Sequence, residues 1–269
     1  MQIAANTRLY GLFGYPLGHT LSPSMHNAAL ESCGIDAVYL ALSVPPEKLA
    51  GAMEGLRAFM GGANVTVPHK VSVIPFLDGL TEVAEAVGAV NTIFWEGDRL
   101  LGDNTDAPAF RETLRDVDLV GKKALILGAG GAAKAVVHAL RQAGIGKISL
   151  AARHPDPKAF PLCDLVFFEK EALAPLLKEV DLVVNATPLG LPKNPESPLS
   201  REQLATLRDG ALVYDLIYTP TSLLSMARER GILVRDGSGM LARQAALSFR
   251  RWTGRDCADF FEKSLASRV

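Results

Sequence analysis

Residues 125–140, LILGAGGAAKAVVHAL, join an apolar strand to a glycine-rich turn and to a helix that begins with small residues. Gly128 allows the tight turn, Gly130 allows the backbone to approach a pyrophosphate, and Ala133 permits close packing of the helix on the strand. The N-terminus of the helix also favours negative charge. A glycine turn without a ligand is the alternative interpretation. The strand before it and the helix after it favour a dinucleotide-binding unit.

Strands and helices alternate on both sides of this turn. Apolar runs typical of strands occupy residues 121–127, 147–153, 181–187, 211–218 and 232–237. Segments with the helical spacing of apolar residues occupy residues 107–117, 128–144, 172–180, 201–207 and 221–231. This order predicts a doubly wound Rossmann domain over residues 106–237.

The N-terminal part of the chain alternates in the same way. Expected strands cover residues 8–14, 37–44 and 62–68, a hairpin covers 89–102, and expected helices cover 22–33, 46–59 and a stretch that ends at 88. Ser22 is expected at the N-cap of its helix, with Pro23 at the first helical position. Helices are also expected over 239–254 and 257–268, and no strand follows them. We therefore predict an α/β protein with an N-terminal α/β domain at residues 1–105, to which residues 238–269 return.

The composition excludes several classes of protein. The chain has 269 residues, of which 48% are hydrophobic and 21% charged, and its net charge is −1. These values predict a folded chain with a large core and argue against binding of nucleic acid or a membrane surface through bulk charge. Neither a membrane span nor a signal peptide is evident, so a cytoplasmic location is expected. Cys33, Cys163 and Cys257 lie far apart in the sequence and are expected to be scattered reduced thiols, with no metal motif.

The end of the second Rossmann strand indicates which cofactor binds. An NAD-binding domain normally has a carboxylate about 20 residues after the glycines, where it holds the ribose hydroxyls. Here the strand ends in Ala152, Arg153 and His154. A guanidinium suits a 2′-phosphate, so we predict NADP. A solvated surface role for Arg153 is the other interpretation, and Asp156, slightly later in the loop, keeps NAD open.

Polar residues fall at strand ends and turns of the first domain. They are Thr20, Ser22, Asn64, Thr66, Lys70, Asn91 and Asp106. In residues 62–68, alternation places Ala63, Val65 and Val67 on one face of the strand, and Asn64 and Thr66 on the other. Most of these residues also have a structural explanation. Ser22 and Asp106 suit helix caps, Asn91 suits a turn, and Asn64 can pair with Thr66.

Lys70 is harder to explain structurally. It follows Pro68 at an expected helix start, where a cation opposes the helix dipole at a cost of about 0.3–1 kcal/mol. A lysine in this position is therefore a candidate for proton transfer.

Seven motifs along the chain carry a resemblance to a known family. They are GYPLGHTLSPSMHN, NVTVPHK, GAVNT, GDNTDA, GAGGAAKA, NATPLG and DGSGMLARQAALSF, in that order. Over essentially its whole length the sequence resembles shikimate dehydrogenase. The resemblance implies NADPH-dependent reduction of 3-dehydroshikimate to shikimate, in the chorismate pathway of aromatic amino-acid biosynthesis.

The resemblance also implies roles for individual residues. It makes Lys70 and Asp106 the catalytic acid-base pair. Around the substrate it places Thr20, Ser22, Asn64, Thr66, Asn91, Tyr218 and Gln244. Around the cofactor it places Glu82, Gly128, Ala129, Gly130, Gly131, Ala132, Ala152, Arg153, His154, Leu216 and Gly237. No metal is implied, and the expected assembly is a monomer or homodimer.

Some residues depart from the family pattern. Ala152 and His154 replace the Asn and Thr that commonly flank the arginine, and the stretch after Tyr218 is about two residues short. His19, His26, His69 and His138 have no catalytic role in the pattern and are expected to be structural or exposed. Two alternatives stay open: a quinate/shikimate dehydrogenase with wider use of substrates and of NAD or NADP, and a non-catalytic NADP-binding sensor.

Overall fold

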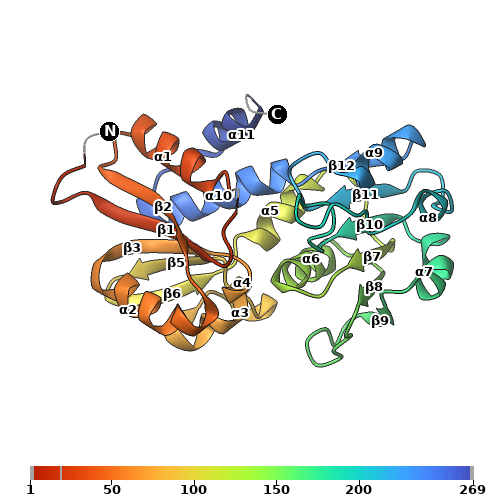
Figure 1. Ribbon diagram of the computed structural model, residues 1–269, viewed down its shortest axis with the longest axis horizontal. Coiled ribbons are helices and arrows are strands. Elements are labelled where there is room, and N and C mark those ends of the chain that lie inside the picture. The colour runs from red at the N-terminus through yellow and green to blue at the C-terminus, as the bar shows by residue number, and fades with distance from the viewer. Residues whose placement is uncertain (1–2, 19, 267–269) are drawn as a thin grey trace. The chain divides into compact units, whose positions relative to one another are not determined.

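A computed structural model describes residues 3–18 and 20–266 of the chain. It divides into two compact units. Unit 1 consists of the described parts of residues 1–109 and 242–269, and unit 2 of residues 110–241. Both units are built from a sheet covered by helices (Figure 1), and the predicted α/β fold class is confirmed.

Unit 1 contains a mixed sheet. Its strands are β1 (Arg8–Gly14), β2 (Ala37–Ser43), β3 (Met60–Val65), β4 (Gly79–Leu80), β5 (Thr92–Glu96) and β6 (Arg99–Asp103), in the spatial order β2-β1-β3-β5-β6-β4. Strands β1, β2 and β3 are parallel, and β5 runs antiparallel to both β3 and β6. The carboxyl ends of β1, β3 and β6 therefore meet the start of β5 at one edge of the sheet.

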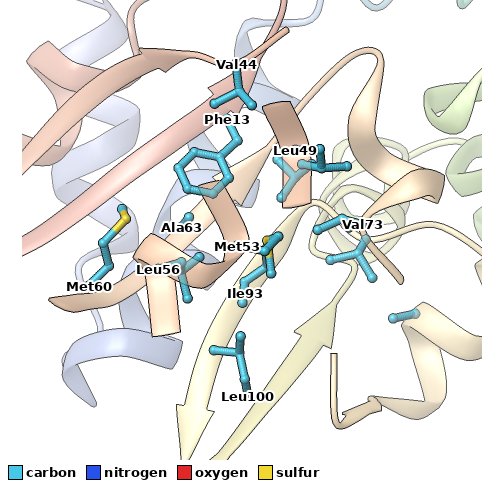
Figure 2. Close-up of a cluster of buried hydrophobic side chains, with 13 residues drawn as sticks. Phe13, Val44, Leu49, Met53, Leu56, Met60, Ala63, Val73, Ile93 and Leu100 are labelled. Atoms are coloured by element: carbon cyan, nitrogen blue, oxygen red, sulfur yellow. The ribbon is translucent and has the colours of Figure 1, made fainter. Parts of the chain in front are cut away.

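Helices cover both faces of this sheet. They are α1 (Ser22–Ser32), α2 (Leu49–Phe59), α3 (His69–Ser72), α4 (Glu82–Val87), the start of α5 (Asp106–Thr113), α11 (Ala258–Ala266) and the part of α10 (Ser238–Thr253) from Ala242 on. Figure 2 shows the core on the α2 face, where Met53 and Leu56 of the helix meet Phe13, Ala63 and Ile93 of the strands. Burial of these apolar side chains holds α2 on the sheet.

The opposite face of the sheet carries an aromatic cluster. His26 of α1 stacks on Tyr39 of β2 with ring centroids 4.4 Å apart, and it lies 5.2 Å from Phe261 of α11 and 5.3 Å from Trp252 of α10. The two C-terminal helices thus pack on the first domain, as predicted. Tyr10, on the same face of β1, stacks on Trp252 at 4.9 Å.

Two local predictions are wrong. Strand β3 ends at Val65, and the Val67 side chain is 65% exposed, so it does not anchor the strand to the core. Pro68 lacks an N–H and cannot continue the ladder, and the last backbone hydrogen bonds with β1 run from the Thr66 N–H to the Phe13 carbonyl and from the Tyr15 N–H to the Val67 carbonyl. Ser22 is the first residue of α1 and makes no capping hydrogen bond, because the N-cap position is taken by Leu21.

Unit 2 contains a parallel sheet. Its strands are β7 (Lys123–Leu127), β8 (Lys147–Ala152), β9 (Asp164–Phe167), β10 (Leu182–Asn185), β11 (Leu212–Asp215) and β12 (Leu233–Arg235). The spatial order β12-β11-β10-β7-β8-β9 reverses at β7, which is the doubly wound order of dinucleotide-binding domains. Strand β9 was not assigned from the sequence, although Leu165, Val166 and Phe167 form a short apolar run, and its residues are partly buried or exposed.

Helices α6 (Gly131–Gln142), α7 (Lys170–Leu177), α8 (Arg201–Leu204) and α9 (Ser222–Glu229) pack around the sheet of unit 2. Leu125, Leu127 and Val183 from the strands form one core cluster with Leu173 of α7 and Leu224 of α9. This core fixes the strand ends of unit 2, where the glycine turn lies.

Candidate active site

Polar residues of unit 1 gather at the sheet edge where β3 and β6 end and β5 begins. Lys70 follows the end of β3, Asn91 directly precedes β5, and Asp106 follows β6 as the first residue of α5. The backbone holds these segments together, because the Val65 N–H donates to the Asn91 carbonyl at 2.8 Å and the Val90 N–H donates to the Lys70 carbonyl at 2.7 Å.

Lys70 and Asp106 form an ion pair. The Lys70 Nζ donates to Asp106 Oδ2 at 2.5 Å, and the two side chains are 13% and 8% exposed. The carboxylate lies at the N-terminus of α5, where the helix dipole favours negative charge. The helix that carries Lys70 has only four residues, so the dipole argument expected at this lysine is weak in the folded chain. The ion pair with Asp106 explains the position of Lys70 better than the helix dipole does.

Asn91 organises a buried network next to this pair. Its Nδ2 donates to Thr105 Oγ1 at 2.9 Å, and its Oδ1 accepts from the Thr105 N–H at 2.8 Å and from Thr92 Oγ1 at 3.0 Å. The hydroxyl of Ser248, from α10, lies 2.7 Å from Thr92 Oγ1. The network therefore joins the start of β5, the segment before Asp106 and α10.

Asn64 continues this network on the opposite face of the sheet from Ala63 and Val65. It is 5% exposed, and its Nδ2 donates to Ser248 Oγ at 2.9 Å and to the Asn91 carbonyl at 3.1 Å. Its Oδ1 accepts from the Tyr39 hydroxyl at 2.8 Å. Burial raises the pKa of Tyr39 well above its usual value, and a hydrogen bond with the Ser22 hydroxyl partly offsets this rise. No hydrogen bond between Asn64 and Thr66 is found among the described residues.

The other predicted residues of unit 1 occupy partly or fully exposed positions. Thr20 Oγ1 lies 3.3 Å from Ser22 Oγ, and Thr66 and Gln244 are partly buried. Glu82 is exposed and lies in the first turn of α4, where its charge suits the helix dipole. Of the predicted set in this unit, the structure brings Lys70 and Asp106 together and joins Asn64 to Asn91.

The glycine turn of unit 2 has the geometry of an anion site. Gly128 has φ +107°, and a Cβ there would lie 2.8 Å from the Ala186 carbonyl oxygen, so only glycine fits. Gly130 is exposed and borders open space, with no atom within 4 Å of the position of a Cβ. It is followed by the twelve-residue helix α6, which begins at Gly131 and continues through Ala132. A pyrophosphate can therefore approach the backbone of Ala129 to Ala132.

The loop after β8 presents the predicted cofactor side chains to solvent. Ala152 is the last residue of β8 and is buried, whereas Arg153 and His154 are exposed. Asp156 uses Oδ1 to accept the Lys158 N–H at 2.9 Å. Its carboxylate therefore closes a local turn, which is the structural role expected of an aspartate in a loop.

A third group of predicted residues follows β11. A Cβ on Gly237 would lie 2.0 Å from the Leu216 carbonyl oxygen, so the two backbones pass in close contact. Tyr218 is partly buried, and the short segment after it ends at Thr221, which caps α9. Asp215 anchors this segment, because its carboxylate accepts from the Ile217 N–H at 3.1 Å and from Thr221 Oγ1 at 2.8 Å.

Several supporting residues were missed from the sequence. Burial raises the pKa of Asp215, and hydrogen bonds from Ile217, Thr221 and Asn185 partly offset this rise. Thr105 and Ser248 were also not assigned. Thr105, Asn185 and Ser248 lie in the motifs GDNTDA, NATPLG and DGSGMLARQAALSF, respectively. These motifs could therefore have indicated all three residues.

The described residues contain neither a candidate metal site nor a candidate membrane-spanning helix. No three side chains of the metal-binding types lie together in the part of the chain that the structure describes. Within residues 3–18 and 20–266, no helix combines the length and apolar character needed to cross a membrane. His26 and His69 are buried, His154 is exposed, and His19 lies outside the described residues.

Comparison with known proteins gives a consistent result along the chain. The family described as shikimate dehydrogenase substrate binding domain matches residues 12–93, and that described as shikimate 5'-dehydrogenase C-terminal domain matches residues 237–258. The shikimate dehydrogenase (NADP(+)) of Moorella thermoacetica is 43% identical over 272 residues, which cover 95% of this chain and 91% of the relative.

Solved structures of similar proteins agree with the fold. Shikimate 5-dehydrogenase from Thermus thermophilus, in complex with NADP(H) and shikimate, matches with TM-score 0.83 and 38% identity over 97% of this chain and all of its own. Shikimate 5-dehydrogenase from Listeria monocytogenes, in complex with shikimate and NAD, matches with TM-score 0.84 and 34% identity over 98% of each chain.

Proposed function

The chain belongs to the shikimate dehydrogenase family, and from this premise we propose that it catalyses the NADP-dependent interconversion of 3-dehydroshikimate and shikimate. This is an oxidoreductase reaction at a CH–OH group in the biosynthesis of chorismate and the aromatic amino acids. The observation that carries the proposal is the Lys70–Asp106 pair, held at 2.5 Å beside a buried network of hydrogen bonds.

Each unit has a separate part in this proposal. Unit 1 binds shikimate, and its ligands are Thr20, Ser22, Thr66 and Gln244, which keep partly exposed positions. Asn64 and Asn91 are buried, and protein partners take up their amide N–H groups. Their main contribution is therefore to fix the strand ends. Unit 2 binds NADP, with Leu216 and Gly237 as further contacts after β11, and Tyr218 is proposed as a further substrate ligand.

Lys70 acts as the acid and base of the reaction. When bound, the reduced nicotinamide supplies a hydride, and negative charge then develops on the oxygen of the ring ketone. The Lys70 ammonium donates a proton to this oxygen in reduction, and the amine accepts the hydroxyl proton in the reverse direction. Asp106 holds Nζ in place through a charge-assisted hydrogen bond.

The residues of unit 2 fit a phosphorylated dinucleotide. Gly128 keeps the turn open, and the backbone from Ala129 to Ala132 offers N–H groups at the start of α6. Arg153 is exposed, and no ion pair engages it among the described residues, so its guanidinium is available for a 2′-phosphate. Ala152 and His154 complete the proposed contacts of this unit.

A four-part absorbance assay tests the proposed function. Nicotinamide reduction at 340 nm is followed with shikimate or quinate as substrate and NADP or NAD as cofactor. We expect fast turnover with shikimate and NADP, and at most weak turnover in the other three combinations. Comparable rates with quinate and NAD would support the broader quinate/shikimate enzyme, and the NAD complex of the Listeria relative makes this the second candidate. Binding of NADP without any turnover would indicate a sensor.

The cellular setting is proposed with the activity. We place the enzyme in the cytoplasm as a monomer or homodimer that acts on small molecules and not on nucleic acid. The net charge of −1 supports the last point, because nucleic-acid binding needs an excess of basic residues.

A further inference from the structure

Two of the three cysteines lie close together in unit 1, although 224 positions separate them in the sequence. The Cys33 and Cys257 sulfurs are 3.1 Å apart, and neither residue is fully buried. Cys33 directly follows α1, and Cys257 directly precedes α11. The expectation of three scattered thiols is therefore wrong for this pair, because the fold of the C-terminal helices brings them together.

The packing of α1 on α11 fixes this proximity. Cys33 is the C-cap of α1 and lies about two helical turns after His26, so the two residues are on the same side of this helix. Phe261 lies four residues after Cys257 and is fully buried, with its ring 5.2 Å from that of His26. The aromatic pair and the cysteine pair are thus successive layers of one interface, so the aromatic layer holds the sulfurs in register.

We propose that Cys33 and Cys257 form a reversible disulfide that fastens α11 to α1, by exchange with a low-molecular-weight disulfide. One cysteine thiolate attacks a sulfur of the oxidant, forms a mixed disulfide and releases one thiol. The second cysteine then attacks the protein sulfur of the mixed disulfide and releases the other thiol. The two cysteines are oxidised, the oxidant is reduced to two thiols, and the two cysteine protons pass to the released thiolates.

The geometry suits such a link. A disulfide has an S–S length of about 2.05 Å, so the two sulfurs need to approach by only about 1 Å. Burial and the neighbouring Cys33 raise the pKa of the Cys257 thiol to about 11, which lowers its thiolate fraction, so exchange at this cysteine is slow. The link would close a loop of more than two hundred residues, and long loops gain the most from closure.

Exchange with glutathione tests the proposal on the full chain. The protein is equilibrated with oxidised glutathione, quenched with acid, and analysed by thiol titration after unfolding and by peptide mapping without reduction. We expect the three thiols to fall to one, a peptide that joins Cys33 to Cys257, and a rise of the thermal midpoint on the order of 5 °C. Cys163→Ser is the matched control and should keep the link and the shift.

Removal of either partner should abolish both effects. Cys33→Ser and Cys257→Ser should each give at most a mixed disulfide with glutathione and no rise in the midpoint. Three free thiols in the oxidised wild type would overturn the proposal, as would separate mixed disulfides on Cys33 and Cys257 without a link between them. A linked protein whose midpoint does not rise would also overturn it, because the link would then not fasten α11. The test does not depend on the catalytic assignment.

Discussion

The buried His26 should make the stability of the protein depend on pH. Its side chain is 1% exposed, and neither ring nitrogen has a hydrogen-bond partner among the described residues. Burial lowers its pKa to about 3, whereas a histidine in an unfolded chain titrates near 6.5. Between these two values the unfolded chain binds the proton and the folded chain does not, so stability falls as the pH falls from 6.5 toward 3.

The size of this effect follows from the pKa difference. Each pH unit below 6.5 costs about 1.4 kcal/mol of unfolding free energy, until the pH reaches the folded pKa. The step from pH 7 to pH 5 should therefore remove about 2 kcal/mol through His26 alone. Other groups titrate in the same range, so the quantity to compare is the difference between wild type and a His26→Phe variant.

Urea unfolding at pH 7 and pH 5 measures this difference. Between the two pH values, wild type should lose about 2 kcal/mol more than His26→Phe. Phe249→Leu is the matched control, because it alters the same aromatic cluster without changing a titratable group, and its cost should be equal at both pH values. An equal loss in wild type and His26→Phe would refute the reasoning, since it would show that His26 can be protonated in the folded state.

Three further predictions concern the cofactor and the polar network. Arg153→Ala should raise the KM for NADP by roughly 10- to 100-fold, because charge-assisted hydrogen bonds to the 2′-phosphate are lost, and should leave the KM for NAD unchanged. An equal change for both cofactors would show that Arg153 does not bind the 2′-phosphate. Ser248→Ala should lower the unfolding free energy in urea by about 1–3 kcal/mol, because it takes a hydrogen-bond partner from buried Asn64, and an unchanged midpoint would contradict this. Gly237→Ala should lower the thermal midpoint and weaken NADP binding measured by calorimetry, because its Cβ would lie 2.0 Å from the Leu216 carbonyl oxygen. A wild-type midpoint together with wild-type NADP affinity would show that the loop relaxes freely.

The sequence was most informative where backbone geometry requires particular residues. Two glycines spaced like Gly128 and Gly130 directly after an apolar strand are typical of a dinucleotide-binding turn. The structure places both at the turn between β7 and α6. The alternation of Ala63, Asn64 and Val65 likewise matches the two faces of β3, because a strand can only place them so.

The sequence was least informative where distant segments meet. Nothing local shows that Ser248 of α10 reaches Asn64, or that Cys33 reaches Cys257, because these contacts depend on how the C-terminal helices return to unit 1. The outward turn of Val67 was missed for a different reason. An apolar residue in an alternating pattern looks buried, but β3 ends at Val65, and Val67 precedes Pro68, which has no N–H to donate to the ladder.

The central claim is that Lys70 transfers the proton in the reaction, with Asp106 holding it. The most direct test is the steady-state rate of Lys70→Met with shikimate and NADP, with Lys123→Ala, a surface lysine paired with Glu179, as the matched control. The account predicts that kcat falls by about 10²–10⁴ in Lys70→Met, with a KM for shikimate that changes little and a folded protein by circular dichroism, while the control keeps wild-type kcat. A near-normal kcat with a raised KM would contradict the account and would make Lys70 a binding residue.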